Sequence, residues 1–268
     1  MTSPTVSVSP EAPVLGDASS SKPPASDEIV LRPARLSDIP IMGNICTDAY
    51  ALNPVTAYLT PKAHMYREDN IQQHRQGCRR RFLNIRNLSI IACLASDPST
   101  IVGFGQFSRL GDDHGAKQFI RDRGLRERVS IYTLSWFFYF YHIVENIIWP
   151  DRITHKARMK EFESWVADDN EIYWNSHPER GIRWYANSVI VSPQFQGKGI
   201  GKKIMLEGLK RAQDERVIMG LTASVEGEYL YRKVGFELLG TFSHRVPGDD
   251  KEGGGIMIWY PEGTNSKS

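Results

Sequence analysis

The feature that most constrains this chain is a strand, a glycine-rich turn and a helix that follow one another from Asn187 onward. A β-branched run, Val189 to Val191, stops at Ser192-Pro193, and a turn with alternate glycines comes next. The apolar positions of the helical pattern behind it are Ile204, Met205, Leu206, Leu209 and Ala212. Such a layout offers unpaired backbone N–H groups at the positive end of a helix, so it predicts a phosphate site.

The spacing of the glycines decides which phosphate motif this is. A Walker loop needs Gly-Lys-Ser/Thr after a four-residue gap, and a dinucleotide fingerprint needs Gly-x-Gly-x-x-Gly. Here Gln196 precedes glycines at alternate positions, which fits neither motif. The pattern Gln-x-x-Gly-x-Gly resembles the pyrophosphate loop of the GNAT superfamily of acyl-CoA N-acyltransferases. Gln196, Gly199 and Gly201 fall on its three defining positions.

A second segment supports this resemblance. Residues 217–222 are typical of a strand, and Ser224–Phe236 resembles the short helix of the family that ends in Tyr-x-x-x-Gly-Phe. By this resemblance, Tyr231 occupies the position of the general acid and Gly235-Phe236 the turn into the next strand. Ser224 stands where many members have Asn.

The resemblance implies an α+β fold, a mixed and mostly antiparallel twisted sheet of about six to seven strands flanked by helices. The expected strands are 28–33, 88–95, 101–108, 184–191, 217–222, 236–242 and 255–259. Ser37 and Asp38 predict the start of a helix over 39–49, and another helix is expected within 62–86. Residues 110–182 form a helical insertion between the third and fourth strands.

Composition sets the expected domain limits and compartment. Residues 1–28 are rich in Ser, Pro and Ala and read as a disordered tail, 29–262 as the acyltransferase domain, and 263–268 as a second tail. The first tail has neither an apolar signal region nor an arginine, so a cytoplasmic location is expected. The three cysteines form no Cys-x-x-Cys pair, so we expect neither disulfides nor a metal site.

If the resemblance holds, acetyl-CoA is the co-substrate and lies in a gap between the fourth and fifth strands. The backbone of Val189, Ile190 and Val191 would bind its pantetheine arm. The expected pyrophosphate-binding residues are Gln196, Gly197, Lys198, Gly199, Ile200, Gly201 and Lys202. Tyr231 would donate a proton to the leaving thiolate.

The base that takes a proton from the attacking amine is left open. Many members of the family use a Glu on or near the fourth strand, but Arg183–Val189 contains no carboxylate. The neighbouring segments offer Asp112, Asp113, His114, His177 and Glu179 as candidates, and the sequence does not choose among them.

The insertion contains an aromatic run, Ile131–Trp149, in which Trp136–Tyr141 is unbroken. The run approaches membrane-spanning length, but Ser135, His142, Glu145 and Asn146 interrupt it, so no span is expected. Two interpretations remain: a helix buried against the sheet, or a wall of aromatic rings that selects the acceptor.

The function favoured by the sequence is transfer of an acetyl group from acetyl-CoA to the primary amine of a small molecule. A protein or peptide N-acetyltransferase and a catalytically weak acyl-CoA-binding regulator are the alternatives. A net charge of +2 gives no reason to expect a nucleic-acid partner. The sequence is compatible with a homodimer.

Overall fold

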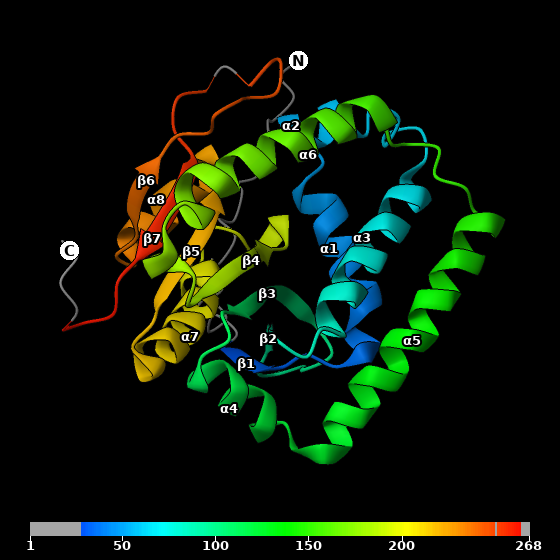
Figure 1. Ribbon diagram of the computed structural model, residues 1–268. Coiled ribbons are helices and arrows are strands. Elements are labelled where there is room, and N and C mark those ends of the chain that lie inside the picture. The colour runs from blue at the N-terminus through cyan, green and yellow to red at the C-terminus, as the bar shows by residue number, and fades with distance from the viewer. Residues whose placement is uncertain (1–27, 250, 264–268) are drawn as a thin grey trace, which may run out of the picture.

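A seven-stranded sheet runs through the part of the chain that the computed structural model describes, residues 28–249 and 251–263 (Figure 1). The strands are β1 (Ile29–Pro33), β2 (Asn87–Leu94), β3 (Ile101–Leu110), β4 (Arg183–Val191), β5 (Ile218–Ala223), β6 (Glu237–Gly240) and β7 (Gly255–Trp259). Their order is β1-β2-β3-β4-β5-β7-β6, and every neighbouring pair is antiparallel except β4 and β5. The expected α+β class is confirmed. Most of the two predicted tails lies outside the described residues.

The helices are α1 (Ile39–Ala49), α2 (Pro54–Leu59), α3 (Arg67–Phe82), α4 (His114–Asp122), α5 (Gly124–Ile148), α6 (Lys156–Asn170), α7 (Ile200–Glu215) and α8 (Val225–Lys233). Short 3₁₀ helices occur at Leu36–Asp38, Pro178–Arg180 and Pro193–Phe195, and a π-helical segment spans Glu171–Asn175. Four helices begin at side-chain caps, where Asn53, Asp113, His155 and Ser224 accept backbone N–H bonds from the first turn. These caps fix where α2, α4, α6 and α8 start.

The two faces of the sheet carry separate hydrophobic clusters. On one face α7 packs Ile204, Met205 and Leu209 against strand residues that include Phe107 and Trp184. On the other face α1 and α3 pack against a second set, which includes Ile91, Phe104 and Ile190. Burial of both faces positions α7 directly behind the glycine turn.

A β-bulge at Asn187 changes which side chains of β4 face α7. Gln106 and Phe107 of β3 are consecutive, but they pair with Ser188 and Ala186, so Asn187 is an extra residue. Before the bulge, Ala186 packs in the cluster under α7. After it, Val189 packs in that cluster and Ile190 packs in the cluster under α1 and α3. One inserted residue therefore switches the alternation of the strand.

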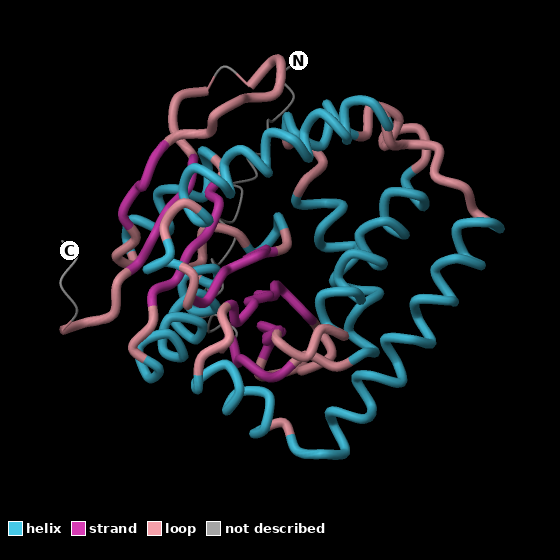
Figure 2. The backbone as a smooth tube through the Cα atoms, viewed as in Figure 1, coloured by secondary structure: helices cyan, strands magenta, loops and turns pink. Residues whose placement is uncertain are grey.

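The aromatic run lies in α5, at the edge of the molecule and away from the strands (Figure 2). Trp136, Phe137, Tyr139 and Phe140 are exposed, so the interpretation of a helix buried against the sheet is wrong. The cause is that α5 turns its polar residues inward, with His142 and Glu145 buried. Hydrophobic content alone did not reveal which side of the helix is covered.

Candidate functional site

A gap opens between β4 and β5 because the two strands pair over only part of their length. Backbone pairing joins Arg183–Ala186 to Ile218–Leu221, whereas β4 continues along β3 as far as Val191. The bulge at Asn187 lies where the two strands separate, and bulges bend and twist a strand. Beyond it, the β5-facing edge of β4 has no strand partner among the described residues. The backbone of Val189, Ile190 and Val191 lies at this open edge, as the sequence predicted.

The glycine turn begins where β4 ends. Gly197 and Gly199 have φ angles of 75° and 77°, a region that favours glycine, and a Cβ on either would meet open space. Backbone conformation, rather than crowding, therefore explains both glycines. The side-chain amide of Gln196 donates to the Val191 carbonyl at 3.1 Å and ties the turn to the strand.

The first turn of α7 offers a site for an anion. Gly199 is the N-cap, no side chain caps this end, and the first turn contains no acidic residue. Its N–H groups lie at the positive end of a 16-residue helix. Lys198 and Lys202 are exposed on the same turn, whereas Lys203 donates to the carbonyl of Ile29 in β1. The turn can therefore bind a phosphate group through backbone N–H groups with lysines beside it.

Tyr231 lies on α8, which starts at Ser224 directly after β5. Its ring packs edge-on against Phe236 with a centroid separation of 5.9 Å. Burial raises the pKa of Tyr231 to about 12. Within the described residues its hydroxyl has no hydrogen-bond partner that would fix the direction of its proton. The group stays protonated at neutral pH and is free to donate.

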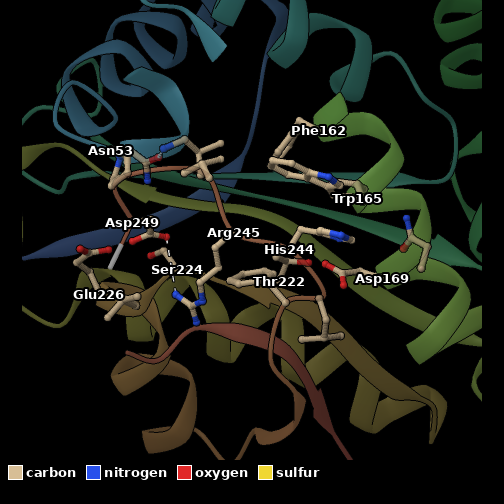
Figure 3. A pocket seen from close by; sticks show the side chains of 18 of the residues that line it. Asn53, Phe162, Trp165, Asp169, Thr222, Ser224, Glu226, His244, Arg245 and Asp249 are labelled. Atoms are coloured by element: carbon tan, nitrogen blue, oxygen red, sulfur yellow. Dashed lines mark hydrogen bonds and ion pairs between the residues drawn. The ribbon is translucent and has the colours of Figure 1, made fainter. Parts of the chain in front are cut away.

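A cavity of about 410 Å³ opens on the same sheet region (Figure 3). Tyr185 of β4 and Thr222 of β5 form its floor, and their hydroxyl groups are hydrogen-bonded at 2.8 Å. α6, the start of α2 and the loop between β6 and β7 surround it. Ser224 and Glu226, at the start of the helix that carries Tyr231, also line it. The cavity therefore borders the place where β4 and β5 diverge.

Aromatic rings and charged groups share the cavity wall. Phe162 and Trp165 come from α6, and His244 from the β6–β7 loop stacks on Trp165 with centroids 5.4 Å apart (Figure 3). Asp169 of α6 accepts the backbone N–H of Ser243 at 2.8 Å, which ties this loop to α6. Apolar rings with a few placed polar groups are typical of small-molecule sites.

The carboxylates around the cavity differ in their partners. Glu226 pairs with Lys251, and this contact holds its pKa below the ordinary value. Asp249 pairs with Arg245 at 3.8 Å. Asp169 is bound through one oxygen, which leaves the other for a ligand. His244 is the only histidine among the described residues that line the cavity.

None of the five base candidates from the sequence is among the described residues that line the cavity. Asp113 caps α4 and pairs with the buried Arg109, Asp112 pairs with Arg86, and His114 begins α4. His177 pairs with Glu179 at 3.1 Å on the turn before β4. The sequence missed His244 and Asp169 because no local motif marks either residue.

The residues from Trp136 to His142, described throughout, do not line this cavity either. The structure therefore gives no support to these rings as an acceptor wall at this cavity, because α6 rather than α5 covers its floor. Both helices belong to the segment between β3 and β4. Trp165 in α6 is the aromatic residue that the sequence overlooked.

Residues 160–238, from α6 to β6, match the sequence model of the acetyltransferase (GNAT) domain. This match includes the open edge of β4, the glycine turn and Tyr231. The chain has the GNAT fold. The resemblance inferred from Gln196–Gly201 and Tyr231–Phe236 is confirmed.

Solved GNAT structures agree with this fold. A histone acetyltransferase HPA2 and related acetyltransferase from Corynebacterium glutamicum is 17% identical, with a TM-score of 0.50 over 89% of this chain and 98% of that chain. Arylalkylamine N-acetyltransferase 2 from Aedes aegypti is 12% identical, with a TM-score of 0.51 over 87% and 99%. No curated protein matches the sequence.

The described residues contain neither a metal-binding cluster nor a membrane-spanning helix. No group of three or more His, Cys, Asp or Glu within residues 28–249 and 251–263 could hold a metal ion. Among the described helices, even the 25-residue α5 is not apolar enough to cross a membrane.

Proposed function

We propose that this protein is an N-acetyltransferase that moves an acetyl group from acetyl-CoA to the primary amine of a small molecule. One observation carries the proposal: the gap between β4 and β5 lies between an anion-binding turn and a walled aromatic cavity. The turn suits a pyrophosphate, the open strand edge an amide-bearing arm, and the cavity an amine. No nucleophile from the protein is needed, because the amine attacks the thioester directly.

Cofactor binding uses the two features that the sequence predicted. The N–H groups at the start of α7, with Lys198 and Lys202, bind the pyrophosphate. The free edge of β4 at Val189, Ile190 and Val191 pairs with the pantetheine arm as a neighbouring strand would. A backbone N–H on this edge also stabilises negative charge on the thioester oxygen.

In the reaction, the amine nitrogen bonds to the thioester carbon and the C–S bond breaks. The sulfur leaves as a thiolate and takes the proton of the Tyr231 phenol. The raised pKa of Tyr231 keeps the phenol protonated at neutral pH, so the proton is present when the thiolate forms beside it. His244 accepts the proton that the ammonium must lose, because it reaches into the acceptor cavity and stacks on its wall.

The acceptor combines an apolar or aromatic body with a primary amine. Phe162 and Trp165 cover the body, and the free oxygen of Asp169 attracts the ammonium. A cavity of about 410 Å³ is within the size range of small-ligand sites, which favours a small molecule over a peptide.

A thiol-release assay with purified protein and acetyl-CoA tests the function. Arylalkyl amines, polyamines and peptides with free amino groups are compared as acceptors. Faster CoA release with arylalkyl amines than with peptides supports the proposal. Binding of acetyl-CoA without release for any amine would favour a regulator, and preference for peptides would contradict the small-molecule acceptor.

A further inference from the structure

α5 has its apolar side facing outward. Its inward side is polar: Gln76 donates to Glu145 at 2.8 Å and to Asn146 at 2.9 Å, and Ser135 donates to the carbonyl of Leu83. Arg79 contacts His142 at 2.8 Å and lies 4.6 Å above the Phe138 ring. These contacts fix the rotation of the helix, so the exposure of the opposite side is built into the fold.

The exposed side forms a continuous line that we call the outer stripe. Its residues are Leu125, Val129, Tyr132, Trp136, Tyr139, Ile143 and Ile147. Each is at least 44% exposed, and consecutive members are three or four residues apart. This spacing is the seam along which one helix packs on another. A stripe of this length on a protein surface marks an interface.

The two ends of the outer stripe differ in charge. Residues 121–128, before and within the first turns of α5, contain four arginines and two carboxylates. At the other end, a cavity of about 560 Å³ between α3 and α5 is lined by Tyr141 and Trp149. Four carboxylates and two arginines also line it. Asp69 pairs with Arg152 and Glu145 with Arg79, whereas Glu68 has an exposed side chain and no ion pair within the described residues.

We propose that the outer stripe is the interface of a homodimer in which two copies of α5 pair in antiparallel orientation. This orientation brings the basic end of each helix to the exposed carboxylate of Glu68 in the other copy. An axis between Trp136 and Tyr139 places Tyr132 opposite Ile143, and Arg126 opposite Trp149. The guanidinium of Arg126 then lies beside Trp149 and Glu68 of the second copy.

Two other occupants fit the surface less well. The N-terminal residues 1–27 contain no aromatic residue and only four Val or Leu residues, so they offer little apolar area to cover the stripe. An anionic membrane would attract the basic end of α5 but offers no cation to the exposed Glu68 at the other end. Charges of opposite sign at the two ends suit a second copy of the same chain.

Sedimentation velocity of the full-length protein tests this proposal over about a hundredfold range of concentration. We expect a dimer for the wild type. Trp136→Glu places a charge at the centre of the stripe and should raise the dissociation constant by about 30-fold or more, as at interface hot spots. Trp136 is 64% exposed, so the variant should keep the fold of the single chain, which circular dichroism checks. Leu52→Glu, at a residue 97% exposed in the α1–α2 loop, should remain dimeric.

A charge exchange tests the orientation. Arg126→Glu and Glu68→Arg should each weaken the dimer, and the double variant should restore it. A monomeric wild type at every concentration, or a dimer insensitive to Trp136→Glu, would refute the proposal. Sedimentation of a monomer with phosphatidylcholine vesicles that contain phosphatidylserine would also refute it and assign the surface to lipid. If both single variants weaken the dimer but the double variant does not restore it, the antiparallel pairing is refuted.

Discussion

At the scale of single residues, the hydroxyl of Tyr231 gives the sharpest test of the chemistry. Tyr231→Phe keeps the ring against Phe236 and removes the acidic proton. We expect turnover to fall about 10²-fold with CoA affinity unchanged, as for loss of a general acid. Steady-state kinetics and calorimetry with CoA measure the two quantities. Tyr229→Phe is the matched control, because Tyr229 lies on the same helix and is 68% exposed. Equal turnover in both variants would leave Tyr231 with a packing role.

The raised pKa of Tyr231 also predicts how stability responds to alkali. The folded state holds the proton up to about pH 12, whereas an unfolded tyrosine releases it near 10. The stabilising contribution is therefore complete below pH 10 and is lost as the pH rises towards 12. Urea titrations at pH 8 and pH 11 should show a smaller loss for Tyr231→Phe than for wild type, by roughly 1 kcal/mol. Equal losses would show that the phenol is not desolvated in solution.

His244 is the proposed base, and the activity lost on its replacement should depend on pH. In His244→Gln, kcat/KM for the acceptor should fall about 10²-fold near neutral pH. The deficit should shrink at higher pH, because more of the amine is then already deprotonated. His177→Gln is the control, because His177 pairs with Glu179 outside the cavity. A loss that stays constant across the pH range would indicate that His244 only shapes the cavity.

At the scale of elements, the turn before α7 couples backbone conformation to anion binding. Gly199→Ala forces a side chain into a positive φ angle and should lower CoA affinity by at least about tenfold, with a stability cost near 1 kcal/mol. Gly124→Ala, at a glycine with φ of 65° and equally open surroundings, should cost similar stability and leave CoA affinity intact. Calorimetry and thermal unfolding separate these effects. If both variants bind CoA alike, the turn is not the phosphate site.

The helix that covers the cavity should determine acceptor specificity. Trp165→Ala removes the ring on which His244 stacks and should raise the acceptor KM about tenfold without changing CoA affinity. Phe137→Ala, on the exposed α5, should leave the acceptor KM unchanged. Kinetics with an arylalkyl amine measure both. If Phe137→Ala raises the acceptor KM and Trp165→Ala does not, the acceptor binds at α5 instead.

At the scale of the whole molecule, the sequence predicted what is encoded locally. The turn from Gln196 to Lys202 and the helix of Tyr231 are continuous segments whose residue pattern carries their conformation. His244 and Asp169 come together only when the β6–β7 loop meets α6, through contacts between residues 74 and 79 positions apart. No periodicity records such a contact. The prediction that the aromatic run of α5 is buried was wrong for a related reason. Only the contacts of α5 with Gln76 and Arg79 show which side of the helix faces the rest of the molecule.

The open edge of β4 makes the empty protein vulnerable in a specific way. Without a pantetheine arm, residues 187–191 expose a strand edge inside the sheet, and unpaired edges can recruit strands from other chains. CoA should therefore act as a folding ligand as well as a substrate. Deuterium uptake at these amides should slow when CoA is added, and storage with CoA should suppress aggregation of the enzyme on warming.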